Sequence, residues 1–239
     1  MRITEFHNDL SWSPPPLSCD VPISKQIREP LPSTAFFMAF CGAAGSGKTS
    51  AAISWLTHPE MYNKVFHNIF VVMPPNSRAS LKGNPFKDHP AEKLFDDLTL
   101  GTLEFVKEYC ETESPEGHNS LLFIDDCAAS LKDGSIQKLF KDLVWNRRHL
   151  KLSIMIMTQS YNAMPLAIRK NISHAVVFKP RNRKELEVLF SELIFLSKDE
   201  QLSLARHVFD EPHNFLFLNT GLNLLYKNFN RLDLSEGNA

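Results

Sequence analysis

Residues 42–49 read Gly42-Ala43-Ala44-Gly45-Ser46-Gly47-Lys48-Thr49, and the rest of the chain is organised around them. The stretch fits the P-loop pattern G-x-x-x-x-G-K-[ST]. An apolar run over residues 36–41 precedes it and predicts a buried strand. Residues 50–56 follow as a predicted helix, which Pro59 ends. Because a strand, a glycine turn and a helix form the context in which this pattern binds phosphate, a chance match in a turn of small residues is the weaker interpretation.

Each part of the stretch has a physical role in holding a nucleotide. Glycine lacks a Cβ, so backbone N–H groups can approach the phosphate oxygens, and the helix N-terminus adds the positive end of its dipole. We therefore predict that the residues from Gly42 to Ser50 bind the phosphates of ATP. Lys48 is expected to reach the β- and γ-phosphates, and the Thr49 hydroxyl is expected to ligate Mg²⁺.

An acidic motif ends the predicted strand that begins at Ser120. The run Leu121-Leu122-Phe123-Ile124-Asp125-Asp126 places two carboxylates after four apolar residues, a pattern typical of a central strand buried on both faces. The carboxyl end of such a strand is where open α/β sheets bind ligands. Asp125 is the predicted Mg²⁺ ligand, through water, and Asp126 is the predicted base that deprotonates the attacking water. The alternative is a simple exit of the strand into a turn.

The remaining elements complete an α/β fold, with a mostly parallel central sheet flanked by helices and a C-terminal β-hairpin. Further strands are predicted over 68–73, 152–157 and 174–178, and the hairpin over 215–226. Further helices are predicted near 91–97 and over 103–109, 135–145, 184–196 and 198–207. Gln159, at the tip of the strand 152–157, is expected beside the γ-phosphate, unless it only caps that strand.

Bulk properties are those of an ordinary globular protein. A length of 239 residues fits one α/β domain with decorations, and a net charge of −1 gives no overall positive field that would indicate nucleic acid. The four cysteines are scattered and form no C-x-x-C pair, so the sequence predicts neither a disulfide framework nor a zinc site. This pattern is typical of a protein in a reducing compartment. The start lacks the apolar core of a signal peptide, and no apolar run is long enough to span a bilayer. We expect a soluble, intracellular protein that is not secreted.

Three segments are predicted: a proline-rich N-terminal arm (1–33), a P-loop domain (34–230) and a C-terminal tail (231–239). The arm holds six of the fifteen prolines, and because proline fixes φ and removes a donor, the arm is predicted to be extended. Packing on the domain, packing on a neighbouring subunit and loose attachment all remain open for it.

Several P-loop classes are excluded by what the chain lacks. A GTPase would need a guanine-reading Asn-Lys-x-Asp, but Val65 and Phe66 follow Asn63-Lys64. The Leu-Ser-Gly-Gly-type signature of ABC ATPases is absent. Small-molecule kinases usually place the acidic strand directly beside the P-loop strand and add an arginine-rich lid. The extra strand over 152–157, with a polar tip, instead favours ATPases that insert a strand between the two motifs and use an acidic base.

Motif order and spacing over residues 36–180 resemble the genome-packaging ATPases of large double-stranded DNA viruses, the poxvirus-like branch of the FtsK–HerA superfamily. Besides the two Walker motifs, the resemblance is carried by Arg148-His149 with the strand after them, by Gln159-Ser160, and by Ile168-Arg169 with Asn171. The chain departs from the pattern in two ways. Asp126 stands where many relatives outside this branch have Glu. The net charge is near neutral, so the composition does not indicate DNA binding.

The resemblance implies a RecA-like (ASCE) P-loop ATPase that uses ATP and Mg²⁺. It further implies a homo-oligomeric ring, pentameric or hexameric, that drives double-stranded DNA into a preformed capsid, with a capsid or portal component as partner. The implied location is the host-cell cytoplasm or viral factory, and transiently the virion vertex. Arg148, between the helix 135–145 and the strand 152–157, is expected at the sheet end opposite the P-loop, and so to act as an arginine finger on a neighbour. Arg147 and Arg169 are rival candidates, and a structural ion pair is the alternative for Arg148.

From the residues alone, only Mg²⁺-dependent nucleotide hydrolysis is predicted. A DNA-translocating motor, a phosphotransferase that needs no DNA, and a nucleotide-gated switch or scaffold all remain open. A basic cluster after the fifth strand is the candidate DNA contact, or else a solvated helix start; its members are Lys179, Arg181, Arg183 and Lys184.

Overall fold

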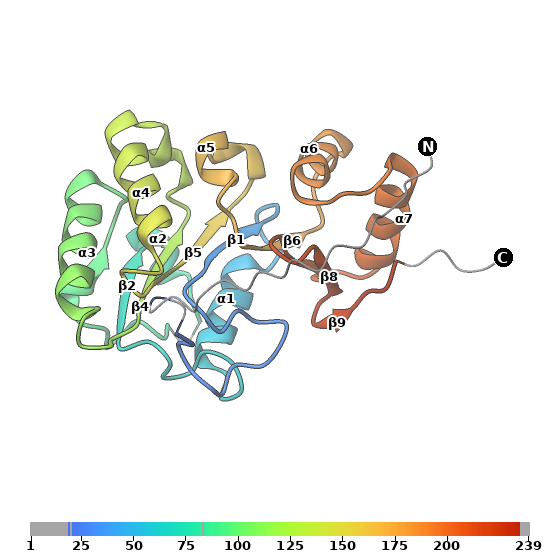
Figure 1. Ribbon diagram of the computed structural model, residues 1–239. Helices are drawn as coiled ribbons and strands as arrows, with labels where there is room; N and C mark the ends of the chain where they lie inside the picture. The colour runs from blue at the N-terminus through green and yellow to red at the C-terminus, as the bar shows by residue number, and fades with distance from the viewer. Residues whose placement is uncertain (1–18, 20, 83, 235–239) are drawn as a thin grey trace, which may run out of the picture.

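The computed structural model describes residues 19, 21–82 and 84–234. They form one nine-stranded sheet with the order β3-β2-β4-β5-β1-β6-β7-β8-β9 (Figure 1). The strands are β1 (Phe37–Cys41), β2 (Asn68–Val72), β3 (Leu94–Phe95), β4 (Ser120–Asp125), β5 (Leu152–Thr158), β6 (His174–Phe178), β7 (Phe215–Asn219), β8 (Leu224–Lys227) and β9 (Asn230–Arg231). The α-helices are α1 (Lys48–Thr57), α2 (Pro75–Ala79), α3 (Leu100–Glu113), α4 (Gly134–Asn146), α5 (Leu166–Arg169), α6 (Arg183–Leu193) and α7 (Lys198–Val208). Short 3₁₀ turns cover Ala91–Lys93, Ala128–Lys132 and Tyr161–Ala163.

The parallel part of the sheet brings the acidic and glycine motifs to one edge. β5 lies between β1 and β4 and is parallel to both, with Cys41 opposite Thr158 and Asp125 opposite Met157. The predicted insertion of one strand between the P-loop strand and the acidic strand is confirmed. Because all these strands end at the same edge, the segments that follow them meet there.

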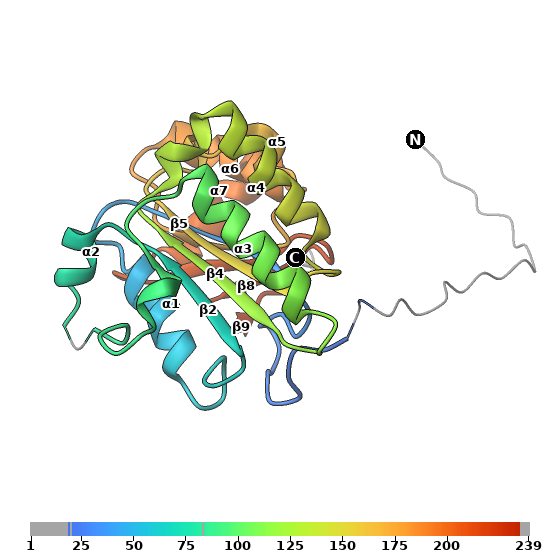
Figure 2. The same ribbon diagram turned by 90° about the vertical axis from the view of Figure 1, so that its left-hand side faces the viewer.

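Helices cover both faces of this sheet (Figure 2). α3 to α7 lie over one face, and α1 lies on the other. Side chains of the β1 segment alternate between the two cores: Phe37, Ala39 and Cys41 face the first, whereas Phe36, Met38 and Phe40 face the second. This period of two explains why the strand is an unbroken apolar run, since both of its faces are buried.

Trp55 fixes the P-loop helix against the sheet. Its ring lies 5.1 Å from that of Phe40 on β1, and 5.9 Å and 6.1 Å from those of Phe215 and Phe217 on β7, measured between centroids. Aromatic pairs of this kind contribute about 0.5–1.5 kcal/mol each beyond their buried area. The helix that begins at the P-loop is therefore tied to the C-terminal strands as well as to β1.

The predicted C-terminal hairpin is confirmed. β7 pairs antiparallel with β6 and with β8, so the sheet changes from parallel to antiparallel at β6. β9 then pairs with the end of β8, and its two residues lie on either side of the predicted boundary between the domain and the tail.

The segment between β2 and β4 differs from the prediction. The predicted helix near 91–97 is wrong: a 3₁₀ turn gives way to β3, which pairs with the end of β2. α2 is absent from the prediction; it begins at Pro75, in the first turn of a helix, where a proline needs no N–H partner. α3 is also longer at both ends than the predicted 103–109.

Part of the predicted arm is described and packs on the domain. Ile23 and Leu31 are buried in the core under α1, and the Tyr62 hydroxyl donates to the Pro32 carbonyl over 3.1 Å. Residues 1–18, 20 and 235–239, which hold most of the arm and of the tail, lie outside the described residues. The division at 33 and 230 stays a prediction. No helix in the described ranges is long and apolar enough to cross a membrane.

Candidate nucleotide-binding site

The P-loop joins the end of β1 to the start of α1 in a conformation that requires glycine. Gly45 and Gly47 have φ of 76° and 101°, in the left-handed region that other residues seldom adopt. Gly42 has no room for a side chain, because a Cβ there would lie 2.7 Å from Cβ of Phe178. Gly47 is the N-cap of α1 and offers no side-chain acceptor, so the first N–H groups of the helix are left for an anion. The Ser46 hydroxyl is buried, and no described residue bonds to it.

Lys48 lies inside the loop. Its Nζ donates to the carbonyls of Gly42 and Ala43 over 2.8 Å and 2.9 Å, and only 8% of the residue is exposed. Burial lowers the pKa of this amine, while the charges of Asp125 and Asp126 act in the opposite direction. The ammonium group is thus held beside the loop backbone, where the oxygens of a bound phosphate would compete with the two carbonyls for its hydrogen bonds.

Thr49 and Asp125 meet across the gap between α1 and β4. The Thr49 hydroxyl donates to Oδ2 of Asp125 over 2.8 Å. Asp125 is buried, and burial raises the pKa of its carboxyl group despite that hydrogen bond. A hydroxyl and a buried carboxylate, side by side at a phosphate loop, are a donor set that suits Mg²⁺, which binds oxygen ligands and keeps phosphate and water for its other positions. The two predicted metal ligands are therefore brought together.

Asp126 and Gln159 form a second pair, at the ends of neighbouring strands. Gln159 Nε2 donates to Oδ1 of Asp126 over 3.2 Å, and both residues are exposed. Asp126 has φ of 59°, a left-handed conformation that Asp and Asn tolerate better than most residues. This turn aims the second carboxylate away from the strand, while Asp125 stays buried.

Two cavities flank the start of α1. One, of about 320 Å³, reaches from Lys48 and Thr49 to Asp125, Asp126 and Gln159. Ser77, Ser80 and Leu81, at the end of α2, line its far wall. The predicted metal ligands, and the predicted catalytic residues other than Arg148, thus share one space with part of the P-loop. The remaining P-loop residues, Gly42, Ala43, Ser46 and Gly47, do not line this cavity.

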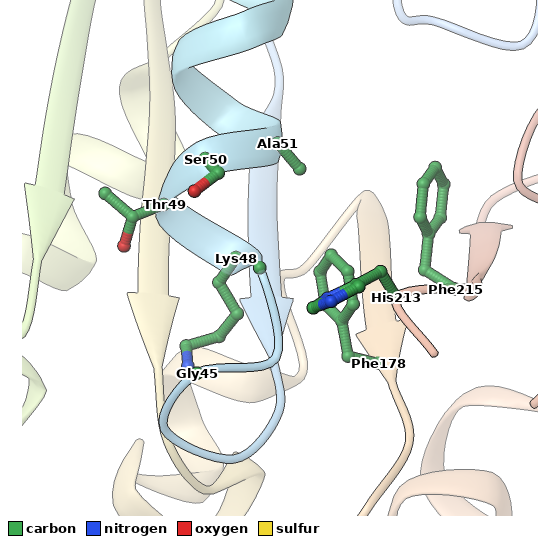
Figure 3. Close-up of a pocket in the computed structure, with 9 residues that line it drawn as sticks. Gly45, Lys48, Thr49, Ser50, Ala51, Phe178, His213 and Phe215 are labelled. Atoms are coloured by element: carbon green, nitrogen blue, oxygen red, sulfur yellow. The ribbon is translucent and has the colours of Figure 1, made fainter. Parts of the chain in front are cut away.

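The other cavity, of about 580 Å³, opens on the opposite side of Lys48 and Thr49 (Figure 3). It is lined by Ser50 and Ala51 of α1 and by Phe178, His213 and Phe215. Sequence reasoning missed these last three residues. His213 lies 167 residues after Ser46, and no motif surrounds it, so only the pairing of β6 with β7 brings it here.

Arg148 lies at the opposite end of the sheet from the P-loop. It is exposed in the turn between α4 and β5, whereas the P-loop follows the far end of β1, which is parallel to β5. At about 3.3 Å per residue, the seven residues of β5 span roughly 20 Å. Arg148 therefore lies about a strand length from its own P-loop.

The rival arginines are engaged within their own chain. Arg169 forms a bidentate pair with Glu192 over 3.1 Å and 2.7 Å, and its guanidinium lies 4.9 Å from the ring centre of Tyr161. Arg147 donates to the Val144 carbonyl over 2.8 Å, and burial lowers its pKa. Such contacts suit structural roles.

The basic cluster lies at the P-loop edge of the sheet. Lys179, Arg181, Arg183 and Lys184 are all exposed, in the segment that follows β6 and begins α6. Arg183 pairs with Glu187 over 3.0 Å, and a cavity of about 430 Å³ runs between this cluster and Arg206 of α7. The positive charge is thus local, on a chain whose net charge is −1.

Comparison with known proteins gives one family and one fold. The family model of the Poxvirus A32 protein matches residues 24–211. No curated protein matches the chain.

Among solved structures, the DNA-packaging ATPase B204 of Sulfolobus turreted icosahedral virus is similar with a TM-score of 0.61 and 12% identity. The match covers 82% of this chain and 97% of that one. The genome packaging NTPase B204 of Sulfolobus turreted icosahedral virus 2, in complex with ATP-γ-S, is similar with a TM-score of 0.57 and 14% identity. That match covers 82% of this chain and 98% of that one. ATPases 2 and 3 of EssC from Geobacillus thermodenitrificans are similar with a TM-score of 0.58 and 14% identity. That match covers 84% of this chain and 41% of that one. At these identities, the likeness shows a shared P-loop ATPase fold.

Proposed function

The chain belongs to the poxvirus A32 protein family, and on that premise we propose that it hydrolyses ATP to drive double-stranded viral DNA into a preformed capsid. The observation that carries the ATPase part is the meeting of Lys48, Thr49, Asp125, Asp126 and Gln159 around one cavity. The packaging part rests on the family and on the packaging role named for the similar B204 proteins.

The P-loop binds and orients the triphosphate. The backbone N–H groups from Gly45 onward and the uncapped start of α1 receive phosphate oxygens, and Lys48 exchanges its two carbonyl partners for the β- and γ-phosphates. The Thr49 hydroxyl, and Asp125 through water, would hold Mg²⁺, which would supply charge neutralisation along the phosphates. Burial raises the pKa of the Asp125 carboxyl group, and a cation held there would favour its charged form.

Asp126 and Gln159 act on the attacking water. The exposed Asp126 carboxylate accepts a water proton, and the Gln159 amide holds that carboxylate toward the cavity through their 3.2 Å hydrogen bond. Asp125 is occupied by Thr49 and is less suited to accept the proton. The two adjacent carboxylates take different roles because Asp126 is exposed to the cavity, whereas Asp125 is buried and bonded to Thr49.

Active units are rings in which each site is shared. Arg148 extends from the far end of the sheet, so a neighbouring copy receives it more readily than its own P-loop does. A guanidinium delivered in this way stabilises the charge that develops on the transferred phosphoryl group. The ring, pentameric or hexameric, encircles duplex DNA and meets a capsid or portal component at the virion vertex.

DNA contacts come from the basic cluster. Its exposed cations lie at the same edge as the nucleotide site, so motion there on hydrolysis is passed to the DNA backbone. Contacts between Lys or Arg and phosphate carry no sequence information, which suits a motor that must move any sequence.

The test is the ATPase rate of the purified chain with and without duplex DNA, with the oligomeric state measured in the same samples. We expect hydrolysis that rises when DNA is added and that tracks the fraction of protein in the ring. Hydrolysis by a stable monomer, indifferent to DNA, would contradict the motor and favour a nucleotide-gated switch. Transfer of phosphate to an acceptor other than water would favour a phosphotransferase.

A further inference from the structure

Placement of the catalytic groups determines where a nucleoside must lie. Asp126 and Gln159 mark the γ-phosphate end, in the cavity on one side of α1. A triphosphate bound along the P-loop then leaves its nucleoside on the other side, at the cavity that opens by Ser50 and Ala51. This step rests on the proposed ATPase function.

The second cavity presents rings at that place. Phe178 ends β6 and Phe215 begins β7, and their ring centroids lie 5.6 Å apart. The side chains of His213 and Phe178 overlap in the view of Figure 3, beside the start of α1, and both lie close to Gly47. The two phenylalanines are largely buried and form a wall, whereas the His213 ring is exposed and available for stacking.

The position of His213 is fixed from two directions. Its φ is 67°, in the left-handed region, so the turn before β7 directs its side chain. Its Nδ1 lies 3.1 Å from the Ser46 carbonyl, where an N–H on that nitrogen donates to the P-loop. A Cβ on Gly47 would lie 3.3 Å from the same nitrogen, so ring and loop are in close contact. An exposed ring that is held this firmly is suited to stack on a base.

We propose that this cavity is the nucleoside site, in which His213 stacks on the base and Phe178 and Phe215 form its apolar wall. Among the described residues that line it, none is Asn, Gln, Asp, Glu or Arg, the side chains that pair readily with the polar edge of a purine. The lysine among them, Lys48, bonds to the carbonyls of Gly42 and Ala43 in the P-loop. Base stacking is tolerant of base identity because every base has a π-face. The site therefore holds adenine and guanine nucleotides with similar affinity.

The test is calorimetric binding of three ligands: the β,γ-imido analogues of ATP and of GTP, and inorganic tripolyphosphate, which has no nucleoside. His213→Asn removes the ring but keeps an amide donor for Ser46 and tolerates the positive φ. We expect it to weaken both nucleotides about tenfold and to leave tripolyphosphate within about twofold. His207→Asn, the same change at an exposed position on α7, is the matched control and should alter none of the three.

Each other outcome decides against the proposal. An equal loss for all three ligands would mean that His213 acts only by supporting the P-loop. Unchanged nucleotide affinity in His213→Asn would place the nucleoside elsewhere. A preference of more than about tenfold between the two purines would show that the base edge is read. Lys48→Ala separates the proposed function from this one, because it should weaken all three ligands; if it weakens none, the P-loop assignment itself fails.

Discussion

Gln159 donates a hydrogen bond to Asp126 over 3.2 Å, although the two lie 33 residues apart. The bond exists because β4 and β5 are parallel neighbours that end at one edge. Asp126 adopts a left-handed backbone conformation there, and the amide on the next strand holds its carboxylate over the cavity that begins at Lys48. The pair is therefore set by the register of two strands together with one unusual turn.

Asp126→Asn should leave ATP bound but stop its hydrolysis. The amide is isosteric and tolerates the same φ, but it cannot accept the proton of the water, so we expect the rate to fall by roughly 10²-fold or more. Phosphate release and calorimetric ATP binding measure the two effects. Asp199→Asn, the same change at an exposed site on α7, is the control. Hydrolysis at the wild-type rate by Asp126→Asn would show that Asp126 is not the base.

Arg148→Ala should abolish hydrolysis while ATP affinity stays nearly intact. An arginine finger contributes roughly 10³–10⁵ in rate and little in ground-state binding. Mixed with Lys48→Ala protein, the variant should regain partial activity, because an intact P-loop in the Arg148→Ala subunit then meets an intact arginine from its neighbour. If mixed rings are shown to form and no activity returns, the trans role of Arg148 is wrong.

Reversing the charge of Arg181, Arg183 and Lys184 to Glu should weaken duplex DNA binding equally across sequences. Cations that bind phosphates release counterions, so the slope of log K against log salt should shrink by about 0.9 for each phosphate that the variant no longer neutralises. Fluorescence anisotropy over a salt series measures it. Matched controls are Lys132→Glu, Lys138→Glu and Lys170→Glu combined, an equal change of charge at other exposed positions. An unchanged slope in the first variant would move the DNA site elsewhere.

His174 should make the protein lose stability in mild acid. Burial, and then the charge of Arg147, lowers the pKa of this histidine from 6.5 to about 4. The folded state thus resists the proton that the unfolded state takes up, so the stabilisation is full above pH 6.5 and is lost as pH falls toward 4. Between pH 7 and pH 5 the loss is about 2 kcal/mol.

His174→Gln should remove this contribution, so the variant should lose less stability than the wild type over that pH range. Urea unfolding at both pH values gives the comparison, with His149→Gln as an exposed control. An identical pH dependence in the variant and the wild type would rule out His174 as the cause.

The parallel core and the phosphate side of the site could be predicted because local patterns encode them. The glycines, Lys48 and the two carboxylates act through backbone geometry that immediate neighbours determine, and strand order follows from where the polar tips must meet. His213 could not be found, since its link to Ser46 depends on how β7 pairs with β6. The pairing of Arg169 with Glu192, across α5 and α6, was invisible for the same reason.

Short elements were the other limit. β3 has two residues and is defined by its pairing with β2. Two residues are too few to show the alternation of apolar and polar side chains that predicts a strand. α2 has five residues, too few for an apolar stripe to appear.

Both outer strands of the described sheet, β3 and β9, are two residues long. A two-residue outer strand itself leaves few unpaired N–H and C=O groups, which limits what another strand can pair with there. Continuous β-sheets across subunits are thereby disfavoured, and so is edge-to-edge aggregation. Between copies of this chain, such edges favour contacts through helices, loops and side chains, which can slide or separate without breaking a ladder of backbone hydrogen bonds.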